Sequence, residues 1–150
     1  MEQVAARVKQ VLDERPRIGK LPPARDLSAK VIASFCGARL REMLGAVFFD
    51  EPTLRLVLRE ARGLDGVVDR VVEKIDALIL AALESDLRVA HKAGVLRRTD
   101  LKLTARYLLG GVEKMVMAAL AADEAIDLEQ IADVAIEIEL FGILSEEIRR

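Results

Sequence analysis

Hydrophobic residues recur every three or four positions through most of this 150-residue chain, which is the spacing of one face of an α-helix. Proline and glycine lie mostly between the periodic stretches, where they end helices or form turns. The pattern therefore predicts an all-α fold, a six-helix orthogonal bundle. The expected helices cover residues 2–15, 26–50, 51–62, 65–92, 101–122 and 127–144.

The helix predicted at residues 101–122 has two apolar sides. One is a wide stripe, as expected for a helix that packs into its own domain. A surface helix needs only that face, so a second stripe of small and flexible residues indicates that another helix packs there too. The members of this second stripe are Leu103, Gly110, Met117 and Ala121, with Tyr107 along the same seam.

The last predicted helix is two-sided as well. Its broad stripe contains Ile131, Val134, Ala135, Ile138 and Phe141. Two adjacent antiparallel helices with spare apolar faces would form an intersubunit four-helix bundle around a two-fold axis. We therefore expect a homodimer, and core packing within a larger monomer is the competing explanation. The residues that this helix is expected to contribute to the interface are Ala132, Ile136, Leu140 and Ile143.

Arg39 lies in the middle of the apolar arc of the second helix, four residues from both Phe35 and Met43. A charged group on an apolar face needs a partner, because burying it alone costs several kcal/mol. One interpretation is an internal ion pair with an acid such as Asp76 or Glu113, or extension of the side chain to water. The other is an anionic or carboxylate-bearing ligand held by the guanidinium group.

A small-molecule pocket is predicted between the second, fourth and fifth helices. Its lining is apolar with a few polar groups, as is usual for such sites. We expect an amphipathic or aromatic ligand with an acidic or carbonyl end, although Tyr107 can also turn toward the dimer seam. The predicted lining residues are Phe35, Cys36, Arg39, Met43, Val72, Ile75, Ile79, Tyr107 and Met115.

Composition excludes several other kinds of site. The chain has one cysteine, Cys36, and one histidine, His91, so we expect no internal disulfide, no metal site and no cofactor. It shows no phosphate-binding loop, no nucleophile elbow and no convincing carboxylate pair, so we do not expect an enzyme. With no leader and no long uncharged run, a cytoplasmic protein without a membrane span is expected.

Charge argues against direct binding to DNA. Residues 123–150 carry nine acidic and two basic side chains, and no segment combines a dense basic face with interleaved aromatic residues. The acidic end is expected to be an ordinary solvated face. We therefore predict that this chain alone binds DNA negligibly.

Three short segments resemble the C-terminal domain of TetR-family transcriptional repressors. They are FFDEP at residues 48–52, AGVLR at residues 93–97 and ARYLLGG at residues 105–111. The resemblance implies an all-helical regulatory domain whose central helices enclose an effector pocket and whose last two helices form the dimer.

The chain departs from that family in one respect. TetR repressors begin with a DNA-binding head of three helices, and nothing before Asp26 can supply it. We expect a fragment, with residues 1–25 as connecting helix and linker and residues 26–150 as the regulatory domain, so that any DNA contact requires a head not present in this chain. A natural protein that works without binding DNA is the alternative. The competing function is a helical protein-interaction module without a small-molecule ligand.

Overall fold

The computed structural model describes residues 2–14, 22–48, 51–52, 55, 66–122, 125–145 and 148. Every regular element within these residues is a helix, so the predicted all-α class is confirmed. The helix predicted at residues 51–62 lies mostly outside the described residues, so the count of six helices stays a prediction. None of the described helices is long and apolar enough to cross a membrane.

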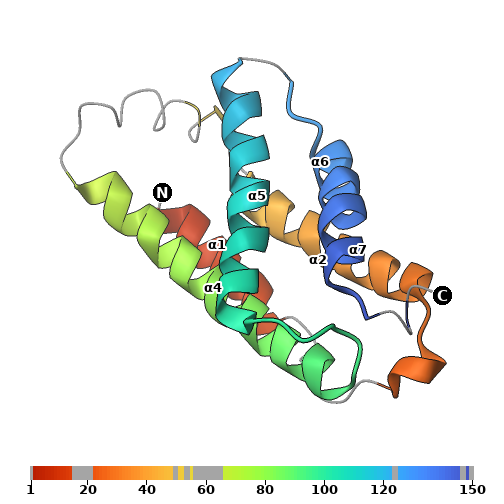
Figure 1. Cartoon of the computed structure of the whole chain (residues 1–150). Helices are drawn as coiled ribbons and strands as arrows, with labels where there is room; N and C mark the ends of the chain where they lie inside the picture. Colours follow the sequence, from red (N-terminus) through yellow and green to blue (C-terminus); the bar gives the residue numbers. More distant parts are fainter. Residues whose placement is uncertain are drawn as a thin grey trace.

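The helices form a closed ring. Helix α1 packs against α2 and α4, α4 packs against α5, α5 against α6, and α6 against α2. In Figure 1, α5 and α6 stand in front of α2, and α1 lies behind α4. The elements in chain order are α1 (Glu2–Glu14), the 3-10 turn η1 (Ala24–Asp26), α2 (Ala29–Val47), α4 (Val67–Lys92), α5 (Leu101–Ala121), α6 (Leu128–Ala135), the π turn η3 (Ile136–Leu140) and α7 (Phe141–Ile143).

Polar side chains begin three of these helices by accepting hydrogen bonds from exposed backbone amides. Asp127 caps α6, with its Oδ1 accepting a hydrogen bond of 2.9 Å from the Gln130 amide. Asp100 does the same for α5. The predicted start of the second helix at residue 26 is wrong: Asp26 lies in the preceding 3-10 turn, and Ser28 caps α2. The intervening turn displaces the helix start by three residues.

Gly94 ends α4 and turns the chain back into the core. Its φ of 76° is in the left-handed region, which suits glycine because it has no Cβ. The next two residues, Val95 and Leu96, are buried, and Leu96 forms an isolated antiparallel bridge with Leu144. The Ser145 amide donates a hydrogen bond of 2.9 Å to the Val95 carbonyl. This pairing fastens the segment after α7 to the turn that precedes α5.

The buried core is divided into three clusters around the ring. Val8 is fully buried in the cluster that joins α1, α2 and α4. Ala132 is fully buried where α6 meets the end of α2, and Leu144 is fully buried in the cluster at the ends of α4 and the π turn. Helix α1 therefore shares a core with α2 and α4, and the boundary near residue 25 stays a prediction.

The last helical segment faces the opposite way from the sequence prediction. Ala132 and Leu140 are buried, and Ile136 and Ile143 are half-buried against the core cluster at the π turn, so these four residues do not form an exposed interface. The difference begins before the π turn: within α6, Ala132 is fully buried where the helix packs against α2, and Val134 is exposed. The packing of α6 against α2 therefore sets which side of the segment faces inward, and the period of a single helix does not encode that choice. Three members of the broad stripe are exposed instead, namely Val134, Ile138 and Phe141.

Candidate functional site: a cavity inside the helix ring

A cavity of about 460 Å³ lies inside the ring, with walls from α2, α4, α5 and the π turn η3. Its volume is within the range of small-molecule sites, about 300 to 1,000 Å³. Most of its lining is apolar, and Phe35 and Val31 combine a place in the lining with exposures of 45% and 57%. These two residues of α2 therefore mark its opening to solvent.

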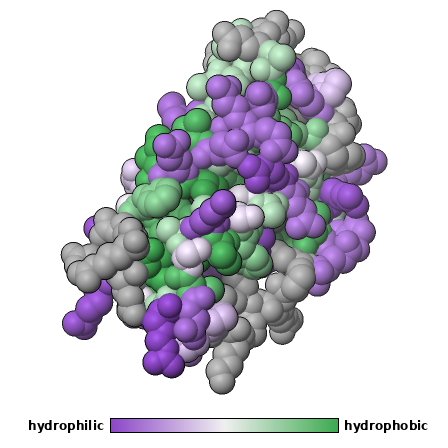
Figure 2. Space-filling view, turned by 90° about the vertical axis from the view of Figure 1, so that its right-hand side faces the viewer, coloured by the Kyte–Doolittle hydropathy of each residue, from purple (hydrophilic) through white to green (hydrophobic). Residues whose placement is uncertain are grey.

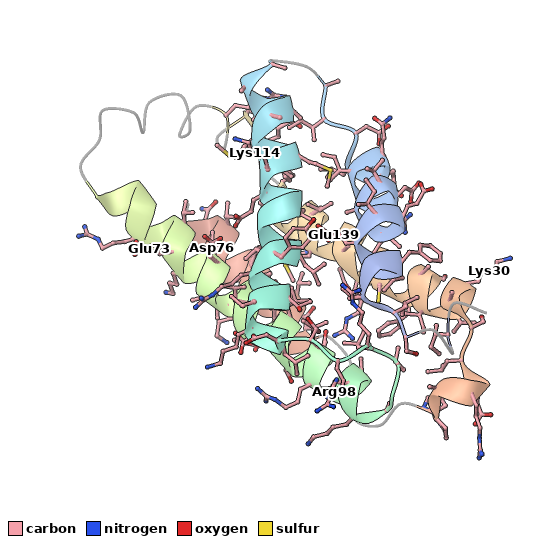
Figure 3. All side chains as sticks on the ribbon, in the orientation of Figure 1. Lys30, Glu73, Asp76, Arg98, Lys114 and Glu139 are labelled. Carbon is pink, nitrogen blue, oxygen red and sulfur yellow. The ribbon has the colours of Figure 1, made fainter. Side chains whose placement is uncertain are left out.

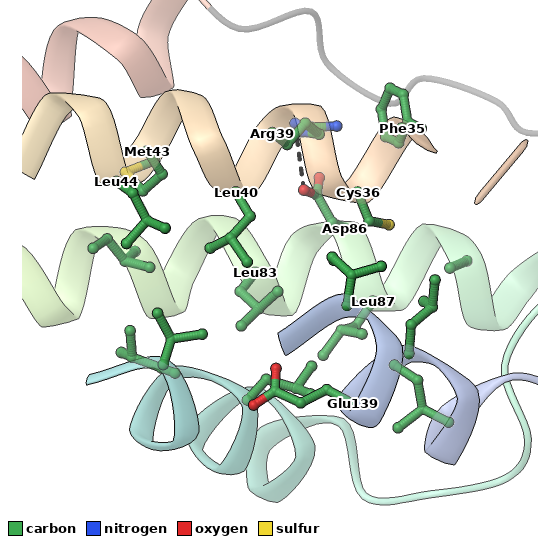
Figure 4. Close-up of a pocket in the computed structure, with 18 of the residues that line it drawn as sticks. Phe35, Cys36, Arg39, Leu40, Met43, Leu44, Leu83, Asp86, Leu87 and Glu139 are labelled. Atoms are coloured by element: carbon green, nitrogen blue, oxygen red, sulfur yellow. Dashed lines mark ion pairs between the residues drawn. The ribbon is translucent and has the colours of Figure 1, made fainter. Parts of the chain in front are cut away.

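Six of the nine predicted pocket residues line this cavity. They come from α2 and α4, whose inward faces were predicted correctly from their helical spacing. Figure 4 shows the α2 members along one wall and the side chains of α4 across from them. The six residues are Phe35, Cys36, Arg39, Met43, Ile75 and Ile79.

The other three predicted pocket residues lie elsewhere. Val72 and Met115 are half-buried and do not line the cavity, and Tyr107 is 71% exposed on the outer side of α5. Neighbouring residues on a helix differ by about 100° in direction. Leu108 and Leu109, which follow Tyr107, therefore line the cavity while Tyr107 points away from it.

Among the described residues, four acids line the cavity, and none of them belongs to the predicted lining: Asp76, Asp86, Glu113 and Glu139. Asp86 lies near the C-terminal end of α4, where a side chain can extend to solvent. Its side chain is only 23% exposed. Glu139 had no sequence signal beyond its place between the apolar residues Ile138 and Leu140.

Arg39 forms an ion pair with Asp86, with 3.3 Å between Nη2 and Oδ2 (Figure 4). Its guanidinium carbon also lies 5.0 Å from the centre of the Phe35 ring, a cation–π distance. The Arg39 side chain is 14% exposed. The structure therefore supports the interpretation that Arg39 forms an internal ion pair. The acid is Asp86 instead of Asp76 or Glu113.

Glu139 projects from the π turn into the ring and lies over Gly111 of α5. A Cβ atom added at Gly111 would collide with Oε1 of Glu139, so the missing side chain leaves room for this carboxylate. In Figure 3, Glu139 lies between α5 and α6, whereas Lys30 and Arg98 extend from the outer surface. Burial raises the pKa of Glu139 from 4.5 to about 7. A substantial fraction of this side chain is therefore protonated at neutral pH.

Glu113 of α5 and Asp76 of α4 form a second acidic group in the cavity wall. Burial raises the pKa of Glu113 to about 7, and the hydrogen bond with Asp76 and its negative charge add to the effect. Glu113 thus holds its proton more tightly than an isolated glutamate would.

Among the described lining residues, the remaining titratable group is the thiol of Cys36. Burial raises its pKa to about 11, against the opposing effect of the Arg39 charge. The thiol is therefore protonated and unreactive at neutral pH. In the part of the chain that the structure describes, no three His, Cys, Asp or Glu side chains are grouped so that they could hold a metal ion.

The predicted interface residues of α5 lie on the outer surface. Leu103 and Met117 are 62% and 46% exposed, and Gly110 and Ala121 are exposed as well. With the outward residues of the last segment, they give α5 and α6 an apolar exterior. Figure 2 views the molecule from the side of α6 and α7 and shows hydrophobic surface interleaved with hydrophilic side chains.

The site is thus an apolar cavity that carries one internal ion pair and two further acidic groups, beside a partly apolar outer face. Comparisons of the chain with protein-family models, with curated proteins and with solved structures found no match.

Proposed function

We propose that this chain is a ligand-binding and homodimerisation domain of a TetR-like transcriptional repressor. Its ligand is a small amphipathic or aromatic molecule that enters the cavity inside the helix ring. The observation that carries the proposal is the cavity itself, because about 460 Å³ of apolar space within a 150-residue chain is costly to keep empty. The three sequence segments that resemble TetR repressors support the assignment to that class.

An acidic end on the ligand is not part of this proposal. It was expected because Arg39 needed a partner, and Asp86 lies 3.3 Å from Arg39. Bringing an anion to the guanidinium would place it beside the carboxylate of Asp86, where the two negative charges repel each other.

The homodimer is supported by the apolar side chains exposed on α5 and on the last helical segment. Large exposed apolar patches on a soluble protein mark sites of association. A two-fold axis along this face would bring both helices of one subunit against those of its partner. The residues that we assign to the interface are Leu103, Tyr107, Gly110, Met117, Val134, Ile138 and Phe141.

The cavity is tested with Nile red, a neutral apolar dye whose fluorescence rises in apolar surroundings. We expect saturable binding by the unaltered protein. Leu83→Trp places a bulky ring in the cavity and should abolish that binding, because Leu83 lines the cavity. Ala81→Trp is the matched control, since Ala81 is exposed on the same helix and does not line the cavity.

Equal dye binding by the two tryptophan variants, or no binding by the unaltered protein, would contradict a ligand site in the cavity. The competing function, a protein-interaction module without a ligand, predicts that result. Native mass spectrometry of the purified protein is the complementary measurement, because it reports the subunit number together with any small molecule that copurifies.

A further inference from the structure

The charged side chains that line the cavity are unevenly distributed in sign. Among the described residues of the lining, one is basic, Arg39 of α2, and four are acidic: Asp76 and Asp86 of α4, Glu113 of α5 and Glu139 of η3. Fully ionised, these groups leave an excess of three negative charges. Apolar walls lower the effective dielectric constant, so this excess acts more strongly on a ligand than it would at the protein surface.

The single base does not offset the whole excess. Arg39 is engaged with Asp86 at 3.3 Å, so this pair is close to neutral for a ligand elsewhere in the cavity. In Figure 4, Glu139 lies across the cavity from the Arg39–Asp86 pair. The uncompensated charge therefore belongs to Glu139 and to the group formed by Asp76 and Glu113.

Glu139 is the acid that is best placed to meet a ligand. No described residue donates a hydrogen bond to its carboxylate or forms an ion pair with it, and burial alone accounts for its raised pKa. The absence of a side chain at Gly111 lets the carboxylate lie at the cavity wall. The half-buried carboxylate of Glu139 is partly desolvated, and a cationic ligand would offset that cost.

We infer that the cavity takes a hydrophobic organic cation, whose protonated amine donates a hydrogen bond to the carboxylate of Glu139 while its apolar body contacts the aliphatic walls. This inference rests on the proposed function, because it names the chemical class of the ligand for the same cavity. The cationic ligand replaces the acidic ligand that we expected from the position of Arg39 in the sequence.

Three naphthalene compounds that differ in charge test the inference: naphthylmethylammonium, naphthylmethanol and naphthylacetate. The chain contains no tryptophan, so naphthalene fluorescence can be followed directly on the whole protein. At about pH 8, where Glu139 is mostly ionised, we expect the ammonium compound to bind roughly tenfold or more tightly than the alcohol, the worth of one charge-assisted hydrogen bond. The acetate should bind most weakly.

Glu139→Gln should lower the affinity for the ammonium compound roughly tenfold and leave the affinity for the alcohol unchanged. Glu137→Gln is the matched control, because Glu137 is exposed two residues away and does not line the cavity. Ammonium affinity should also increase from about pH 6 to about pH 8 as Glu139 loses its proton, whereas alcohol affinity should not.

Equal affinities for the ammonium compound and the alcohol, or tightest binding of the acetate, would overturn the cation inference and leave the ligand-binding cavity intact. The cation inference would also be overturned if Nile red binds and none of the three compounds does, or if the two glutamine variants behave alike. Failure of all four probes to bind would overturn both the cation inference and the proposed ligand site.

Discussion

The carboxylate of Glu139 lies where the side chain of residue 111 would be if Gly111 were any other amino acid. Glycine within a helix costs about 1 kcal/mol of stability relative to alanine. Gly111→Ala should therefore stabilise the protein by about 1 kcal/mol only when Glu139 is shortened to alanine, and should destabilise it or change nothing when Glu139 is present. Chemical denaturation of the two single variants and the double variant measures this coupling.

Gly110→Ala is the control for that cycle, since a Cβ added at Gly110 meets no atom within 4 Å. It should behave the same with or without Glu139. If Gly111→Ala is as stabilising as Gly110→Ala in the presence of Glu139, the two residues are not in contact.

Removal of the Arg39 charge should lower the stability of the folded protein. Arg39→Met leaves Asp86 in a site where its side chain is only 23% exposed, with no opposite charge at 3.3 Å. We expect the free energy of unfolding to fall by about 1 to 3 kcal/mol, because the largely buried carboxylate of Asp86 loses the opposite charge of Arg39. Replacing Asp86 by Asn in the same protein should restore part of the loss. No recovery in the double variant would show that Arg39 stabilises the fold through packing alone.

Stability should fall as the pH rises toward neutrality. The pKa of Glu139 is about 7 in the folded protein against an ordinary value of 4.5, so the folded state holds its proton more tightly than the unfolded state. That contribution is fully present below about pH 4.5 and is lost as the pH rises through about 7; Glu113 acts in the same direction. Because Glu139 is only half-buried, solvent screening should limit its part to about 1 kcal/mol.

Melting temperatures of the unaltered protein and of Glu139→Gln between about pH 5 and pH 8 measure this contribution. The glutamine variant should show a shallower decline, whereas Glu137→Gln should follow the unaltered protein. Parallel curves for all three proteins would mean that the Glu139 carboxyl is not desolvated.

The proposed dimer should be sensitive to charge on the outer face of α5. Met117 is 46% exposed there, and Met117→Glu would place a carboxylate in each copy of the interface. We expect sedimentation to show the dissociation constant rising roughly tenfold or more. Ala77→Glu adds the same charge at an exposed position of α4 and should leave the association unchanged. A monomer at micromolar concentration for the unaltered chain would refute the dimer directly.

Local signals in the sequence predicted the described helices and the residues that line two walls of the cavity. The period of α2 and α4 placed Phe35, Arg39 and Ile75 on inward faces, because a helix of 3.6 residues per turn projects its apolar positions to one side whatever lies opposite. Gly94 and Asp127 determine helix ends for a similarly local reason, since each acts on the backbone within its own turn.

Only the tertiary structure decided which acids face the cavity and which face of the last helical segment is buried. Packing of α6 against α2 buries Ala132 and leaves Val134 exposed, and the apolar spacing of the segment fits either orientation. The pairing of Arg39 with Asp86 and the placement of Glu139 over Gly111 each join residues from different helices. Such contacts depend on how the ring closes, and the period of a single helix carries no information about the residues across from it.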